Sequence, residues 1–251
     1  KTFVPKLKPD RVIYGICPND ITYSYEQLDT TTALALPAIL SSPFSNKTKI
    51  IFLASPNNPT GNILSEPDLV KLLQSELIVV IDETYYEFCN ISFSHLIDKY
   101  ENLIILRSFS KWSGLAGLRI GYAISNPKII EKLILIKQPY NINSAAETVA
   151  LEAISKKDFL LEKVQILLEQ RDKIFQFLQG KKGIKVYPSY ANFLLVDFGE
   201  IDANLVFENL AKNGIFVRKF SHPMISNALR ISSGTPDQIR ILLQVLDQFI
   251  K

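Results

Sequence analysis

The sequence predicts an α/β protein in which a large domain, with a mostly parallel sheet sandwiched by helices, is followed by a smaller C-terminal α+β domain. Two observations lead to this prediction. Three short apolar runs, "KIIFLAS" (49–55), "ELIVVID" (76–82) and "NLIILRS" (102–108), lack in–out alternation, which is typical of strands buried on both faces. A helical pattern separates the first two runs, and strand–helix–strand order favours parallel strands joined by right-handed crossovers.

The helix between the first two strands is expected at residues 65–74. Ser65 can cap its N-terminus, and leucines spaced along one face form an apolar stripe. Further along the chain, residues 145–178 are helical in period. This segment is either two helices or one long helix broken near residues 156–158.

The C-terminal part has the composition of a compact α+β unit. Its expected elements lie at residues 184–189, 191–198, 202–212, 214–220, 227–234 and 236–250. We place the domain boundary near residue 152, which gives a large domain over residues 1–152 and a small domain over residues 153–251. In the N-terminal part, residues 11–16 are expected to form a strand and residues 34–42 a short helix.

The composition is that of an ordinary soluble globular protein, with 47% hydrophobic and 21% charged residues and a net charge of +3. Basic and acidic residues are mixed and no basic stripe carries interleaved aromatic residues, so the composition disfavours nucleic-acid binding. No apolar run approaches the ~20 residues of a membrane span. Cys17 and Cys89 are too few for a disulfide framework and lack metal-ligand spacing, which predicts a reduced, cytoplasmic setting without a metal site.

Polar clusters follow directly after each of the three apolar runs. They read "SPNNPTG" (55–61), "DETYYEF" (82–88) and "RSFSK" (107–111). Ligands of open parallel sheets bind outside the carboxyl ends of the strands. If the strands are parallel neighbours, six side chains converge on one edge: Asn58, Asp82, Tyr85, Ser108, Ser110 and Lys111.

These clusters, with "SFSKWSGLAGLRIGY" (108–122) and "ALRISSGT" (228–235), resemble the four ordered motifs of fold-type I pyridoxal-phosphate (PLP) aminotransferases. The similarity is greatest to the histidinol-phosphate aminotransferases, which "KQPYNINSAAE" (137–147) and "YPSYANFLLVDF" (187–198) also resemble. It extends from about residue 34 to the C-terminus. The resemblance implies PLP as cofactor.

The resemblance also implies a role for each residue at the strand ends. Lys111 would bind the cofactor aldehyde covalently and then move the substrate proton as acid and base. Asp82 would keep the pyridine nitrogen protonated. Tyr85 (with Tyr86 as the alternative) and Asn58 would hydrogen-bond the phenolic oxygen of the cofactor ring.

The cofactor phosphate would be held by Ser108, Ser110 and Arg119, which supply two hydroxyls and one guanidinium fork. Gly114 and Gly117 lie between Lys111 and Arg119, and we expect them to let the backbone turn back toward the phosphate. Glu83, by contrast, is expected to be structural.

Two arginines of the second domain match the substrate-binding positions of the family. Arg230, in "NALRISSG", would anchor the substrate carboxylate, and Arg218, in "GIFVRKF", would join it in binding the phosphate of histidinol phosphate. One arginine pair would then serve glutamate and the phosphorylated partner in turn.

The sequence departs from the family at its N-terminal end. The family's arm to the partner subunit, its first small-domain segment and its Gly-rich phosphate turn have no counterpart here. The chain begins with Lys1 and its only methionine is Met224, so we expect a longer protein; a truly short one would put cofactor retention and dimerisation in doubt. Phe3 and Tyr23 are the two candidates for the aromatic residue that stacks on the cofactor ring.

The sequence therefore predicts a cytoplasmic, homodimeric, PLP-dependent aminotransferase that transfers an amino group between glutamate/2-oxoglutarate and a phosphorylated partner in histidine biosynthesis. Two enzymatic alternatives remain open: a threonine-phosphate decarboxylase of cobalamin synthesis and a broader aromatic amino-acid aminotransferase. A binding module that keeps the fold without the cofactor is the non-enzymatic alternative.

Overall fold

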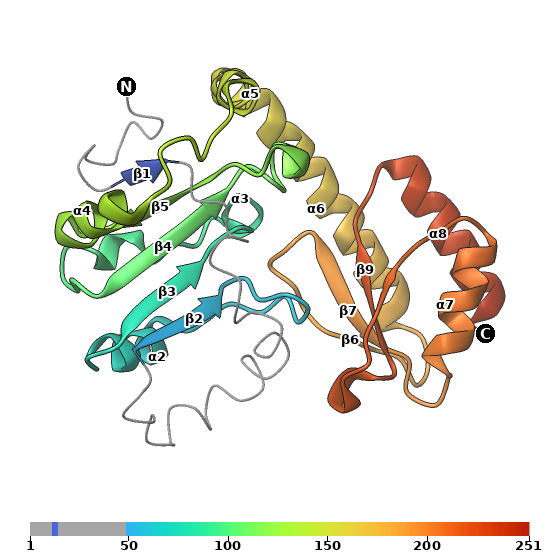
Figure 1. The fold of residues 1–251 in the computed structure, drawn as a ribbon. Coiled ribbons are helices and arrows are strands. Elements are labelled where there is room, and N and C mark those ends of the chain that lie inside the picture. The colour runs from blue at the N-terminus through green and yellow to red at the C-terminus, as the bar shows by residue number, and fades with distance from the viewer. Residues whose placement is uncertain (1–11, 15–48, 251) are drawn as a thin grey trace. The chain divides into compact units, whose positions relative to one another are not determined.

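The computed structural model of the 251-residue chain describes residues 12–14 and 49–250, which fold into helices and sheets (Figure 1). The chain divides into two compact units, one of Lys1–Pro56 and Ile63–Leu161 and the other of Asn57–Asn62 and Glu162–Lys251. The boundary that we place near residue 152 lies within a helix of the first unit. The division into residues 1–152 and 153–251 stays a prediction.

The first unit contains a five-stranded sheet in the order β1-β5-β4-β3-β2 (Figure 1). Its strands are β1 (Val12–Tyr14), β2 (Ile50–Ala54), β3 (Ile78–Asp82), β4 (Leu103–Ser108) and β5 (Gly121–Ser125). β2, β3 and β4 are parallel neighbours, whereas β5 pairs antiparallel with both β4 and β1. The three apolar runs thus form strands as predicted, and residues 12–14 of the strand expected at 11–16 form β1.

The parallel strands are buried on both faces, which explains why their sequences do not alternate. On one face, Ile81 of β3 and Ile105 of β4 pack against the leucines of α2 (Glu66–Leu73). On the other face, Val80 and Ile104 pack with Ile129 of α4 (Pro127–Ile136). Each strand therefore presents alternate side chains to two different helical layers.

Two helices of the first unit, α2 and α4, begin at polar caps that are readable in the sequence. The Ser65 side chain accepts a hydrogen bond from Asp68 N at the start of α2, as predicted. Asn126 caps α4 in the same way, but neither α4 nor β5 is predicted by the sequence analysis. Among the described residues, the other helical elements of this unit are α3 (Tyr86–Cys89), η3 (Ser94–Leu96), η4 (Ala116–Leu118) and α5 (Ser144–Ser155).

The long helical segment is broken at Lys156, where α5 ends and α6 (Lys157–Gln179) begins. The Lys156 amide donates back to Glu152 O and Ile154 O, so α5 has its own C-terminus. The prediction of a break near residues 156–158 is therefore confirmed.

The second unit contains a four-stranded antiparallel sheet in the order β6-β7-β9-β8 (Figure 1). Leu194 and Val196 of β7 and Ile231 of β9 pack into one core with α6, α7 and α8. Leu195 of β7 belongs to a separate cluster on the opposite face. The elements are β6 (Lys185–Val186), β7 (Phe193–Asp197), α7 (Ala203–Lys212), β8 (Arg218–Lys219), η5 (Pro223–Ile225), β9 (Ala228–Ser232) and α8 (Pro236–Phe249).

Some sequence predictions lie outside the described residues. They are the short helix at residues 34–42 and the two candidate stacking residues, Phe3 and Tyr23. Of the helices within residues 12–14 and 49–250, none combines the length and apolar character that a membrane crossing requires.

Candidate active site

Asp82 and Ser108 end the neighbouring parallel strands β3 and β4. Ser55 N donates to Asp82 O over 2.9 Å, and Glu83 N donates to Leu106 O over 2.9 Å, so the pairing continues to the carboxyl edge of the sheet. By strand alternation Asp82 follows Val80, and Ser108 follows Leu106, onto the same face of the sheet. A carboxylate and a hydroxyl are thereby placed side by side at one edge.

Tyr85 and Lys111 come from the segments that follow β3 and β4. Tyr85 is buried at the start of α3, and its ring packs 6.3 Å from that of Phe88. The Lys111 Nζ lies 5.9 Å from the centre of the Tyr85 ring. Lys111 is itself exposed, so its amine is accessible at the edge where Asp82 ends its strand.

The loop after Ser108 folds back on itself and brings Ile120 next to Phe109, while Arg119 Nη1 donates to Ala116 O over 3.1 Å within the loop. Phe109 N donates to Ile120 O over 3.2 Å, which closes the loop at its base. Gly114 has a φ of +70°, a backbone conformation that favours glycine, whereas no positive φ occurs at Gly117. Arg119 itself adopts a left-handed φ of +53°. The turn that the sequence analysis expects at two glycines therefore falls on Gly114 and on Arg119.

Two hydroxyls lie together at the start of this loop. Ser108 Oγ donates to Ser110 Oγ over 2.8 Å and accepts from Ser110 N over 3.0 Å. Ser108 is only 2% exposed, so its position is fixed by packing. We call Asp82, Tyr85, Ser108, Ser110, Lys111 and Arg119 the strand-end cluster; all of them belong to the first unit.

The other three predicted site residues, Asn58, Arg218 and Arg230, belong to the second unit. Arg218 and Arg230 are direct cross-strand partners on β8 and β9. Since Leu195 is also paired with Arg230, this face is the one turned away from the α6–α8 core. Like charges directly opposite each other destabilise a sheet, so this pairing is not explained by the stability of the sheet. We call Arg218 and Arg230 the arginine pair.

Arg230 contacts the turn that contains Asn58. Its Nη1 donates to Asn58 Oδ1 over 2.6 Å, and its guanidinium carbon lies 5.1 Å from the centre of the Phe193 ring. The turn is closed by Gly61 N, which donates to Asn57 O over 2.7 Å. Thus Asn58 and Arg230 are joined although they are far apart in the sequence.

Gly61 is required in this turn for two reasons. Its φ is +76°, and a Cβ at this position would overlap the Ser189 side chain at 2.2 Å. Gly61 O also accepts from Tyr190 N over 2.7 Å. The glycine of "SPNNPTG" thereby lets residues 57–62 pack against the segment before β7.

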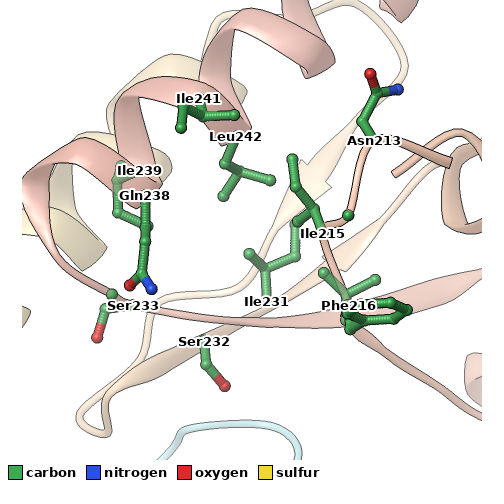
Figure 2. A pocket seen from close by; sticks show the side chains of 13 residues that line it. Asn213, Ile215, Phe216, Ile231, Ser232, Ser233, Gln238, Ile239, Ile241 and Leu242 are labelled. Carbon is green, nitrogen blue, oxygen red and sulfur yellow. The ribbon is translucent and has the colours of Figure 1, made fainter. Parts of the chain in front are cut away.

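The second unit also contains a hollow of about 390 Å³ between residues 213–217, the end of β9 and the start of α8 (Figure 2). Figure 2 shows Ile231 and Leu242 directed into it, with Phe216 at its border. Ile231 belongs to the helical core of this unit, whereas its neighbour Arg230 alternates to the other face of β9. The hollow is therefore separate from the arginine pair.

No motif in the sequence assigns a role to Arg107, which lies next to Ser108. It is 6% exposed and forms an ion pair with Glu83, with Arg107 Nη2 at 2.7 Å from Glu83 Oε2. A signal for this pair is present in the sequence, because an arginine inside an apolar strand requires a buried partner. Glu83, which the sequence analysis expects to be structural, is that partner.

Comparison with known proteins agrees with the fold and the motifs. A family model described as "Aminotransferase class I and II" matches residues 20–246. The solved histidinol-phosphate aminotransferase of Sinorhizobium meliloti, in complex with pyridoxal-5'-phosphate, superposes with a TM-score of 0.75 at 25% identity, covering 85% of this chain and 62% of that one. The fold is thus that of the fold-type I PLP-dependent transferases.

Relatives by sequence specify the family further. Histidinol-phosphate aminotransferase 1, chloroplastic, of Arabidopsis thaliana is 43% identical over 205 residues, which are 81% of this chain and 49% of that protein. The histidinol-phosphate aminotransferase of Caldanaerobacter subterraneus subsp. tengcongensis is 42% identical over 206 residues, covering 81% of this chain and 58% of that protein. This chain belongs to the class I and II aminotransferase family. It spans about half the length of the curated relatives that it matches.

Proposed function

We propose that this protein is a PLP-dependent aminotransferase that exchanges an amino group between glutamate/2-oxoglutarate and the pair imidazole-acetol phosphate/histidinol phosphate. One observation carries the proposal: the Lys111 Nζ lies 5.9 Å from the Tyr85 ring, at the sheet edge where Asp82 and Ser108 share a face. The identity to histidinol-phosphate aminotransferases over four fifths of the chain supports the choice of substrates.

The strand-end cluster fits PLP chemically. An amine matches the aldehyde, a carboxylate matches the protonated pyridine nitrogen, and a phenol matches the ring hydroxyl. The adjacent hydroxyls of Ser108 and Ser110, with the Arg119 guanidinium, match a phosphate. When bound, PLP supplies an electron sink for the carbanion that forms as the substrate Cα loses its proton.

Lys111 has two tasks in the proposed reaction. As an amine it holds the cofactor aldehyde, and after substrate binds it accepts the Cα proton and donates it again as acid and base. This requires an accessible Nζ beside the ring site, which agrees with the exposure of Lys111 next to the buried Tyr85.

Asp82 would hold a proton on the pyridine nitrogen, because a carboxylate beside that nitrogen favours its charged form. Thr84 N donates to Asp82 Oδ1 over 2.8 Å and so orients the carboxyl group. Tyr85 and Asn58 would donate to the phenolic oxygen. Asn58 Oδ1 already accepts a hydrogen bond from Arg230, so the side-chain nitrogen of Asn58 is the atom that would donate to the cofactor.

The arginine pair would recognise the substrates. Arg230 and Arg218 present two guanidinium groups from neighbouring strands, which can bind a carboxylate or a phosphate in a bidentate manner. The same pair would therefore accept glutamate and the phosphorylated substrate in alternation, as a ping-pong reaction requires.

We further propose a homodimer in the cytoplasm. Leu135, Ile136 and Tyr140, around the end of α4, are 78%, 79% and 93% exposed. Apolar side chains gathered on a surface in this way mark an interaction site in many proteins. Leu135→Asp with Ile136→Asp is expected to lower the mass measured by sedimentation from dimer to monomer; an unchanged mass would remove this support.

The function is tested by incubating the full-length protein and PLP with glutamate and imidazole-acetol phosphate. We expect 2-oxoglutarate and histidinol phosphate in equal amounts. Carbon dioxide release from threonine phosphate without amino transfer would favour the decarboxylase alternative instead. Efficient transfer to aromatic keto acids would favour a broader aminotransferase, and absence of PLP binding would favour a non-enzymatic module.

A further inference from the structure

We propose that Arg107, together with Glu83, is a positioning residue that sets the places of three cofactor ligands, Asp82, Tyr85 and Ser108. This inference rests on the proposed function, because the three residues are cofactor ligands only if that function holds. Its basis is a buried polar network on the face of the sheet opposite to Asp82 and Ser108.

The Glu83 carboxyl group lies at the centre of this network. Oε2 accepts from Arg107 Nε over 2.8 Å and from Ser92 Oγ over 2.8 Å, and Arg107 Nη2 lies 2.7 Å away. Oε1 accepts from Phe93 N over 2.8 Å. All four contacts are donated to the carboxyl group, as an ionised carboxylate requires. Burial raises the pKa of Glu83, and the Arg107 charge and these contacts act against that rise. The Glu83 side chain is 0% exposed, so water does not compete with these contacts.

The Arg107 guanidinium connects three segments of the chain. Besides Glu83 it contacts Ser92, whose Oγ accepts from Nη2 over 2.9 Å. Its central carbon lies 3.4 Å from the centre of the Tyr86 ring, a stacked arrangement in which the flat guanidinium covers the ring. β4 is thereby linked to the end of β3, to the first turn of α3 and to the segment before η3.

Each proposed cofactor ligand is the immediate chain neighbour of a member of this network. Asp82 precedes Glu83, Tyr85 precedes Tyr86, and Ser108 follows Arg107. Successive side chains of a strand point to opposite faces, so fixing Glu83 and Arg107 on one face fixes Asp82 and Ser108 on the other. A displacement of Arg107 would therefore move all three ligands together.

The electrostatic environment makes this network sensitive to small changes. Burial lowers the pKa of Arg107, whereas the charge of Glu83 raises it. The net shift is a rise, so the guanidinium stays charged. Burial raises the pKa of the nearby Glu87 to about 7 and that of Tyr122 to about 12. Arg107 thus faces Glu83, Glu87 and Tyr122, and Glu83 is the partner that neutralises it through direct contacts.

The test compares PLP binding by the wild-type full chain with that by Arg107→Lys. Lysine keeps the positive charge but loses the planar fork, the Ser92 contact and the stacking on Tyr86. We expect the dissociation constant for PLP to rise at least about tenfold. We also expect the pH midpoint of the visible absorbance of bound PLP to shift by at least about half a unit, since Asp82 moves relative to the ring.

A matched control separates positioning from general stability. Leu72→Ala removes a buried side chain on the same face of the sheet, near the end of α2 that leads into the start of β3. This variant should lower the melting temperature at least as much as Arg107→Lys. Its PLP dissociation constant should stay within about twofold of wild type, and its absorbance midpoint within about 0.2 pH units. Equal losses of PLP affinity in both variants would overturn the proposal.

Ser92→Ala provides a milder perturbation if Arg107→Lys does not fold. It keeps the charge pair and removes only the hydroxyl that contacts both Glu83 and Arg107. The PLP dissociation constant is expected to rise about threefold, and an unchanged constant would contradict the proposal. Failure of the wild-type chain to bind PLP would instead contradict the proposed function, so the two failures are distinguishable.

Discussion

The two sheets of this molecule differ in what covers them, and in the proposed function this difference separates cofactor binding from substrate binding. The parallel strands of the first unit are buried on both faces, so their polar residues are at the carboxyl edge, where Asp82 and Ser108 lie. The sheet of the second unit carries α6, α7 and α8 against one face and the arginine pair on the other. A sheet with helices on both faces provides rigid ligands for a cofactor, whereas a sheet with long helices on one face only can offer charged side chains to exchangeable substrates.

The largest effect should come from the first unit, at Asp82. Asp82→Ala removes the carboxylate that would keep the pyridine nitrogen protonated, so kcat should fall by about 10²–10³-fold. Steady-state kinetics with glutamate measures this loss. Glu101→Gln, an exposed carboxylate paired with Lys128 in the same unit, should leave kcat within about twofold of wild type. Comparable losses in both variants would remove the distinction that we draw between edge and surface carboxylates.

In the second unit, changes to the arginine pair should act on KM more than on kcat. Arg230→Gln loses a charged, bidentate donor and should raise KM for glutamate about 10–100-fold. Arg218→Gln should raise KM for the phosphorylated substrate about tenfold, with a smaller effect on glutamate. The control is Lys219→Gln. Lys219 lies next to Arg218 on β8, but its Nζ lies 5.9 Å from the centre of the Phe207 ring, on the face of the sheet that packs against α7. A fall in kcat without a change in KM would break the proposed division between the units.

The turn at Gly61 allows a stability test of the second unit. Gly61→Ala must adopt a φ of +76° and displace Ser189, so unfolding free energy should fall by about 2–3 kcal/mol. Gly180→Ala is the matched control, since no atom lies within 4 Å of its added Cβ. Chemical denaturation measures both. Equal stability of the two variants would show that residues 57–62 do not pack as described.

A smaller and pH-dependent effect is expected at Glu87 in the first unit. Burial raises the pKa of Glu87 from 4.5 to about 7, so the folded chain keeps a proton that the unfolded chain releases between these values. The contribution of Glu87 to the free energy of unfolding is therefore fully present below about pH 4.5 and is lost as the pH rises to about 7. Glu87→Gln should therefore gain stability relative to wild type across this range, on the order of 2 kcal/mol at about pH 8.

Urea unfolding at several pH values measures the difference between Glu87→Gln and wild type. Glu152→Gln is the control, because the exposed Glu152 is paired with Lys156 and its pKa is lowered by that contact. A constant difference between Glu87→Gln and wild type over the whole range would contradict the burial of the Glu87 carboxyl oxygen Oε2.

Much of the fold follows from patterns of five to ten residues. Apolar runs without alternation predict β2, β3 and β4, and Ser65 predicts the start of α2 correctly. β5 and α4 are missed because "GYAIS" mixes glycine and serine into a short strand, and because the cap at Asn126 is noticed only once the strand before it is known. Local patterns thus predict strongly apolar elements best.

In the candidate site, too, some features can be predicted from short sequence patterns and others cannot. The positions of Asp82, Tyr85, Ser108 and Lys111 follow from strand ends and motif spacing. The Arg107–Glu83 pair and the contact from Arg230 to Asn58 depend on tertiary packing between segments, 24 and 172 residues apart respectively. Such contacts leave no periodic signal in one sequence. Only the chemical cost of burying a charge indicates that Arg107 must have a partner.

The central claim is that Lys111 is the residue to which PLP binds covalently, and one measurement tests it directly. The full-length protein is incubated with PLP, reduced with sodium borohydride, digested and analysed by mass spectrometry. The account predicts a phosphopyridoxyl group on the peptide that contains Lys111, and its loss in Lys111→Ala. A group attached to another lysine in the wild-type protein, or to none, would contradict the account.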